Sequence, residues 1–305
     1  MTSEARSKRG DAPTFPLASF EPVHAQEHIA LFLAYLKDDD LSPRTIKAYR
    51  YNLERFLGWL YTSMGDVPPT YQDAGAYRDH LVELGRRVSS INQCLAAVRR
   101  FLDWGRSMGL ISTSGKVKEI RETRIPRPAM DGKSTRRLLT MMEREAPARD
   151  RAIVLCGLGL GLRISEICSL RIRDVGFTPR TITVRVLGKG RVSREVQSAG
   201  KRTRDWILER VREVEDSSEE NVEGRPLIGL RASFASELVR SWGLRAGIDG
   251  LHPHMLRRTY GQIRRRAGIS IEVVSRELGH SRLDTTAIYT TPEGQDLEVL
   301  EYGYL

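Results

Sequence analysis

The residues of this sequence that could do chemistry together lie in four short, separated segments of its second half. They are two arginines, one lysine, two histidines and one tyrosine: Arg163, Lys189, His254, Arg257, His280 and Tyr289. Two arginines can hold the non-bridging oxygens of a phosphodiester, because the fork of a guanidinium matches their geometry. Fixed cations favour the transition state, where negative charge is concentrated on the reacting phosphate. A lysine or histidine can protonate the leaving oxygen, and a tyrosine, serine or cysteine could form a covalent ester.

Other common reaction types lack their motifs in this sequence. It holds no pair of carboxylates placed to bind a divalent metal, no Walker-type loop, no Gly-x-Gly-x-x-Gly and no Gly-x-Ser-x-Gly. Its three cysteines, Cys94, Cys156 and Cys168, lack the paired spacing of a zinc site. The side chains on offer bind anions and move protons, which is the help that a phosphodiester needs if no metal is used, and no motif for a cofactor is present.

Each candidate, taken singly, also has an ordinary structural explanation. Arg163 and Glu166 are spaced like an ion pair on one face of a helix, and Lys189 stands between two glycines, as at a solvated hairpin tip. His280 follows a glycine that could join two helices of a DNA-binding helix-turn-helix. Tyr289 could be a half-buried packing residue. Only the occurrence of all the segments together favours catalysis.

The charge balance suits a polyanionic partner. The 305 residues include 49 Lys+Arg and 39 Asp+Glu, with both signs interspersed and a net charge of +10. Basic side chains that neutralise phosphates release counterions, although many proteins are basic for solubility alone. The N-terminus shows no apolar stretch of a secretory signal, and the longest apolar run, 152–162, is too short to span a bilayer. We expect a protein of the cytoplasm, associated with the nucleoid.

The pattern along the chain predicts two domains, mainly α, with a small β-hairpin or sheet in the second. Residues 1–21 are typical of a flexible arm, and helical periodicity over 22–112 predicts a helical bundle. Residues 113–130, rich in charge with Ser, Gly and Pro, predict a linker with little to bury. Residues 131–305 predict a mixed α/β domain, since two β-branched runs flank the turn at 188–190.

Four motifs resemble those of the tyrosine recombinases, the family of the phage integrases and the bacterial Xer recombinases. They are Gly-Leu-Arg-x-Ser-Glu at 161–166, Gly-Lys-Gly at 188–190, His-x-Leu-Arg at 254–257, and Leu-Gly-His at 278–280 with Tyr289 nine residues on (289 − 280). The resemblance covers the whole second domain. Arg258 stands where many relatives carry a second histidine, which is not one of the family's catalytic residues.

The resemblance implies a two-domain clamp, with a helical core-binding domain and a catalytic domain, that cuts and rejoins DNA at specific sites. It implies a 3′-phosphotyrosyl intermediate and a Holliday junction. The implied roles are phosphate binding by Arg163 and Arg257, general acid for Lys189, proton transfer at the nucleophile Tyr289 for His254, a phosphate hydrogen bond from His280, and orientation of a neighbour by Glu166. The implied assembly is a homotetramer on two double-stranded DNA sites, a dimer per site, alone or with a sister recombinase or accessory factors.

Two other functions stay open at this point. A DNA-binding regulator, or a degenerate relative that does not cut, would need no nucleophile, and a topoisomerase-like relaxing enzyme would use similar tyrosine chemistry without site dependence. In the first domain, some basic residues are expected to contact DNA phosphates. For any single one of them, an ordinary solvent-exposed position is an equally good explanation. The candidates are Lys47, Arg50, Arg99 and Arg100.

Overall fold

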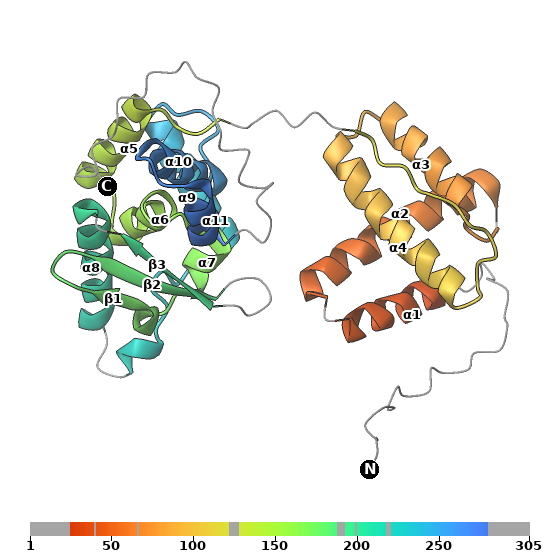
Figure 1. Ribbon diagram of the computed structural model, residues 1–305, viewed down its shortest axis with the longest axis horizontal. Coiled ribbons are helices and arrows are strands. Elements are labelled where there is room, and N and C mark those ends of the chain that lie inside the picture. The colour runs from red at the N-terminus through yellow and green to blue at the C-terminus, as the bar shows by residue number, and fades with distance from the viewer. Residues whose placement is uncertain are drawn as a thin grey trace, which may run out of the picture. The chain divides into compact units, whose positions relative to one another are not determined.

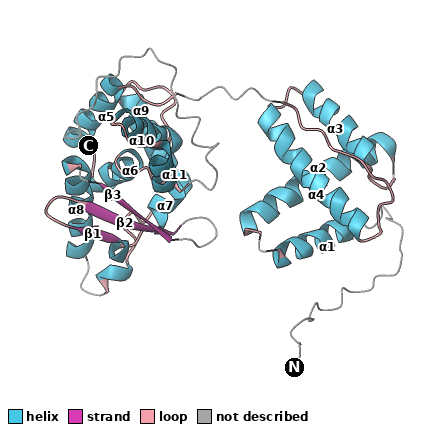
Figure 2. Cartoon of the chain, in the orientation of Figure 1, coloured by secondary structure: helices cyan, strands magenta, loops and turns pink. Residues whose placement is uncertain are grey.

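The structure is a computed structural model that describes residues 25–39, 41–65, 67–121, 128–187, 193–198, 200–217 and 221–279. The chain divides into two compact units, Met1–Arg124 and Ile125–Leu305, each with its own hydrophobic core. The first unit is helical, and the second combines helices with one small sheet (Figure 1 and Figure 2). The expectation of a mainly helical fold with a small sheet in the second domain is confirmed. The predicted arm, 1–21, lies outside the described residues.

The described part of the first unit is a helical bundle. Its helices are α1 (Ala25–Asp38), α2 (Pro43–Met64), α3 (Tyr71–Glu83) and α4 (Val88–Ser107). Helix α2 begins as the sequence suggests, because the Ser42 hydroxyl accepts a hydrogen bond from the Thr45 backbone N–H at 3.2 Å and proline follows Ser42. Thr70 and Asp73 form a reciprocal capping box at the start of α3.

Aromatic side chains fill the core of this bundle. The Phe32 ring of α1 lies edge-on to Phe101 of α4, with centroids 5.4 Å apart, and 5.5 Å from Trp104. Such pairs add about 0.5–1.5 kcal/mol to the free energy gained from burial alone. The packing holds α1 and α2 against α4, which crosses α2 (Figure 1).

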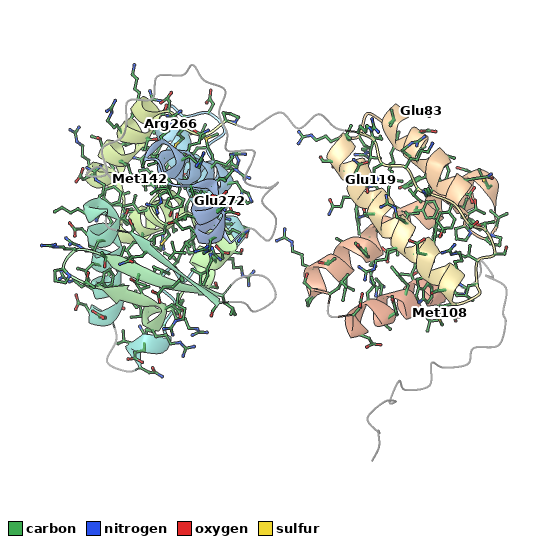
Figure 3. All side chains as sticks on the ribbon, viewed as in Figure 1. Glu83, Met108, Glu119, Met142, Arg266 and Glu272 are labelled. Atoms are coloured by element: carbon green, nitrogen blue, oxygen red, sulfur yellow. The ribbon has the colours of Figure 1, made fainter. Side chains whose placement is uncertain are left out.

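The segment that follows α4 packs onto the bundle through residue 121. Val117 is buried, and the Asn92 side chain of α4 both donates to the Ile120 carbonyl and accepts from its N–H, each at 2.9 Å. Glu119 lies beside α4, where it pairs with Arg99 at 2.9 Å (Figure 3). The first part of the expected linker therefore packs on the bundle more closely than its composition suggests. Val117 and Ile120 supply apolar side chains, and the Asn92 amide satisfies the backbone N–H and carbonyl of Ile120.

Helix α6 is the centre of the second unit. The helices of its described part are α5 (Gly132–Glu145), α6 (Ala148–Leu158), α7 (Ile164–Ser169), α8 (Lys201–Asp216), α9 (Ala232–Arg245), α10 (Pro253–Arg266) and α11 (Ile271–Leu278), with 3-10 turns η2 (Ile172–Asp174) and η4 (Val222–Gly224). Every residue of α6 from Ala152 to Leu158 is buried. A helix that is apolar on all sides must be enclosed, and α8, α9 and α10 lie around it (Figure 1).

An antiparallel sheet in the order β1-β2-β3 covers one side of this core. Its strands are β1 (Val175–Phe177), β2 (Ile182–Leu187) and β3 (Ser193–Ser198), with Val184 opposite Val196 in register. The predicted hairpin is thus present as β2 and β3, although its turn, 188–192, lies outside the described residues. The sequence analysis did not predict β1, which at three residues is too short to show alternation.

Candidate active site

The described candidate residues come from separate elements of the second unit. Arg163 is the residue that precedes α7, Glu166 lies within α7, and both His254 and Arg257 lie on α10. Helix α11 contacts α10 and β3 (Figure 2). The tertiary fold therefore brings together segments that are far apart in the sequence.

A buried carboxylate, that of Glu166, is the centre of this cluster. It is 6% exposed and accepts from the Arg163 N–H and the Arg163 guanidinium, each at 2.8 Å. Arg194 of β3 donates from both terminal nitrogens, at 3.0 and 2.9 Å, and Arg257 Nη1 lies 3.9 Å away. The ion pair expected between Arg163 and Glu166 as an ordinary structural explanation does form, but as part of a larger group of three arginines.

The protonation state of Glu166 follows from these contacts. Burial alone raises the pKa of its carboxyl, but hydrogen bonds and charge from Arg194, together with hydrogen bonds from Arg163, hold the pKa below its ordinary value of 4.5. Glu166 is therefore ionised at neutral pH. Three guanidinium cations around one carboxylate leave a local charge of +2 (3 − 1), which favours the binding of an anion.

Arg257 is almost fully buried, at 2% exposure. Its Nη1 donates to the Gly161 carbonyl at 2.6 Å and its Nη2 donates to the Leu278 carbonyl. These bonds fix the guanidinium between the turn that precedes Arg163 and the end of α11. Arg163 is more open, since its side chain is 32% exposed.

His254 lies in the first turn of α10. Although the residue as a whole is exposed, partial desolvation of the ring and the positive charge of Arg257 lower the pKa of His254 below its ordinary value of 6.5. The imidazole is therefore neutral at pH 7 and can accept a proton.

Gly161 allows the turn before Arg163 to pack closely. Its φ is +64°, and a Cβ there would lie 2.5 Å from the Tyr260 ring. We expect Gly161→Ala to lower the free energy of unfolding by more than Gly229→Ala, where φ is +68° but nothing lies within 4 Å of the added Cβ. The control should cost about 1–2 kcal/mol from backbone strain alone, and the clash adds to that at Gly161. Urea unfolding measures both, and equal losses would contradict the close packing.

The other predicted catalytic residues, Lys189, His280 and Tyr289, lie outside the described residues. The structure does describe Leu187 and Ser193, which end the strands on either side of the hairpin turn, and Gly279, which directly precedes His280. In the part of the chain that the structure describes, no three metal-binding side chains gather, and no helix there is long and apolar enough to cross a membrane.

The candidate DNA contacts of the first unit lie on α2 and α4. Lys47 and Arg50 are exposed on α2, and Arg50 lies 3.9 Å from Glu54. Arg99 pairs with Glu119, and Arg100 pairs with Asp39. Because exposed ion pairs are worth little, these pairs leave the DNA-contact prediction open.

Arg194 is the residue that the sequence analysis missed. In β3 it lies two residues before Val196, which is buried against the core, so the two side chains share the core-facing side of the strand. A charged residue on the apolar side of a strand needs a partner of opposite charge. The presence of a charged residue on the apolar side of the strand is the signal that could have identified Arg194.

Comparison with known proteins identifies the family. The model of the phage integrase family matches residues 128–295, and that of the phage integrase N-terminal SAM-like domain matches residues 29–109. The chain therefore belongs to the phage integrase family, the tyrosine recombinases, which break and rejoin DNA.

Its similar relatives are Xer recombinases. Tyrosine recombinase XerA of Thermococcus kodakarensis is 33% identical over 271 residues, covering 87% of this chain and 90% of the relative. XerA of Pyrococcus furiosus is 29% identical over 286 residues, covering 91% and 94%. XerC of Vibrio vulnificus is 31% identical over 290 residues, covering 90% of each.

Solved structures show the same fold. XerH bound to its difH substrate before cleavage has a TM-score of 0.74 at 16% identity, covering 91% of this chain and 96% of that one. A lambda integrase dimer bound to a core site has a TM-score of 0.68 at 14% identity, covering 90% and 98%.

Proposed function

We propose that this chain is a site-specific DNA recombinase that cuts one strand at a time with Tyr289 and rejoins it to another, for integration and excision, transposition or dimer resolution. The observation that carries the proposal is the buried Glu166 carboxylate, which is hydrogen-bonded to Arg163 and lies 3.9 Å from Arg257, within a cluster that has a surplus of positive charge. A phosphodiester is the anion that such a pair fits.

In the proposed reaction, Arg163 and Arg257 hold the non-bridging oxygens of the scissile phosphate, and His280 donates a hydrogen bond to one of them. The Tyr289 hydroxyl attacks phosphorus and its proton passes to the neutral His254, while Lys189 protonates the leaving 5′-oxygen. The P–O5′ bond breaks as the tyrosine–phosphate bond forms. Because an ester replaces an ester, the reverse attack by a 5′-hydroxyl rejoins DNA without a cofactor.

The relatives' solved complexes support a DNA partner: XerH with difH and lambda integrase with a core site are both held on their sites. We propose that this chain likewise binds double-stranded recombination sites, as a dimer per site and a homotetramer on two sites, through a Holliday junction. The proposed place of action is the cytoplasm, on nucleoid DNA. Lys47, Arg50, Arg99 and Arg100 are proposed phosphate contacts.

Covalent trapping on DNA tests this function. The wild-type chain and Tyr289→Phe are each mixed, in EDTA, with random-sequence duplexes that carry a nick, so that a short cleaved fragment diffuses away and the adduct persists. We expect wild type, and not Tyr289→Phe, to give DNA that migrates with denatured protein. Sequencing that DNA should return a common site.

Three other outcomes would overturn the proposal. Binding of the duplexes without any adduct would favour a regulator or a non-cutting relative. Adducts with no shared sequence, together with relaxation of any supercoiled plasmid, would favour a topoisomerase-like enzyme. An adduct that forms in a parallel reaction with Mg²⁺ but not in EDTA would show that the chemistry needs a metal.

A further inference from the structure

Three arginines cap the C-terminal end of α11 by donating hydrogen bonds to its last carbonyls and to that of Gly279. Arg194 Nε donates to the Glu277 carbonyl at 3.1 Å, Arg257 Nη2 to the Leu278 carbonyl, and Arg163 Nη2 to the Gly279 carbonyl at 3.1 Å. The last carbonyls of a helix have no partner within it and carry the negative end of the helix dipole. The two proposed phosphate-binding arginines are thus anchored to the last residues before His280, and Arg194 is anchored beside them.

Arg194 donates two of the four hydrogen bonds that the Glu166 carboxylate is seen to accept, and Arg163 donates the other two. The two terminal nitrogens of Arg194 reach one carboxylate oxygen each, in the forked geometry that makes arginine–carboxylate pairs strong. Its side chain is 14% exposed, less than half the exposure of Arg163. A Cβ on Gly279 would lie 3.0 Å from the Arg194 Cζ, so the glycine leaves room for this guanidinium.

Without Arg194, the buried carboxylate would have to find other donors. The nearest further cation is Arg257, whose Nη1 now lies 3.9 Å from Glu166 and donates to the Gly161 carbonyl instead. Glu166 would keep only its two hydrogen bonds from Arg163, and a buried carboxylate that has lost half of its donors would draw Arg257 toward it. That movement would take Arg257 from its bond to the Leu278 carbonyl and from the place where it would hold a phosphate.

We propose that Arg194 is a positioning residue for strand cleavage: it neutralises Glu166 and holds the end of α11, which keeps Arg163 and Arg257 aimed at the phosphate. The inference rests on the proposed function. Arg194 also couples the hairpin to the site, since β3 follows the turn that carries Lys189, and His280 follows Gly279 directly in the chain.

The test uses a nicked duplex that the wild-type chain has selected by covalent trapping. For wild type, Arg194→Gln, Arg194→Lys, Glu166→Gln and the double variant Glu166→Gln/Arg194→Gln, we measure the single-turnover rate of adduct formation, the Kd for the same duplex, and the melting temperature. Arg194→Gln is expected to slow adduct formation by about 10²-fold, the size of effect of a small misplacement of reacting groups. Its Kd should change by less than about threefold, because many phosphates share the binding energy.

Two further results distinguish positioning from a structural role. Arg194→Lys should recover part of the rate, since lysine restores the charge but not the fork; it also carries the test if Arg194→Gln fails to fold. The double variant should be no slower than Arg194→Gln alone, because residues that act as one unit are not additive. The matched control, Arg212→Gln on the exposed side of α8, should match wild type.

A wild-type cleavage rate in Arg194→Gln would overturn the inference. So would a loss of duplex affinity as large as the loss of rate, which would make Arg194 a DNA contact, or independent effects that multiply in the double variant. If the wild type itself forms no adduct with any duplex, the proposed function has failed, and that result is distinct from each of these.

Discussion

Arg257→Gln is expected to slow formation of the covalent DNA adduct by about 10²- to 10³-fold, the cost of removing one fixed donor that stabilises a transition-state charge. Glutamine offers one NH₂ group, so it cannot reach the Gly161 and Leu278 carbonyls and a phosphate together. The carbonyls it abandons are buried, which should also cost about 1–3 kcal/mol of folding stability for each one left without a donor.

The measurement is a single-turnover rate on the trapped duplex, taken at a temperature where both proteins are folded. Arg240→Gln, on the exposed side of α9, is the control for loss of one positive charge, and we expect its rate to match wild type. If Arg257→Gln matched the control in rate, Arg257 would serve the fold alone and would not bind the phosphate.

Glu166→Gln is expected to lower the free energy of unfolding by about 3–5 kcal/mol at neutral pH, as when one partner of a buried ion pair is removed. Three arginines would then surround a neutral amide, and two of them would lose a charge-assisted bond. The folded pKa of Glu166 lies below its ordinary value of 4.5. Its contribution is therefore fully present above pH 4.5 and is lost as the pH falls through the folded pKa.

Urea unfolding at neutral pH and at several values below pH 4.5 tests both statements. The gap in stability between wild type and Glu166→Gln should narrow as the pH falls. Glu195→Gln, exposed on β3, is the control and should change stability by less than about 0.5 kcal/mol. A gap that stayed constant with pH would show that Glu166 is not ionised in the folded protein.

Local patterns predicted most of the elements of the fold. Helices α10 and α11 fall where proline and serine start them and where their apolar periodicity ends, and the hairpin strands follow their β-branched residues. These features depend on residues close in sequence, which is why one sequence reveals them. The placement of residues 111–121 could not be predicted in this way, because it depends on hydrogen bonds to Asn92, which lies on another element.

The candidate site shows the same division. Arg163, Glu166, His254 and Arg257 were identified from motifs, and the structure brings the three charged residues of this set together. Arg194 belongs to the cluster through contacts with residues more than twenty positions away in the chain. Its place on the apolar side of β3 indicates that it needs a partner, but not which residues those partners are. The roles assigned to Lys189, His280 and Tyr289 stay predictions.

The packing of residues 111–121 on α4 also decides where the chain can be divided without damage. A fragment that ends at Ser112 would discard Val117 and Ile120, strip the Asn92 amide of both its partners, and leave an apolar strip of the bundle open to water. A fragment that extends through Arg121 retains all of them. The compact N-terminal unit is therefore longer than its helices, and residues 111–121 belong to it structurally.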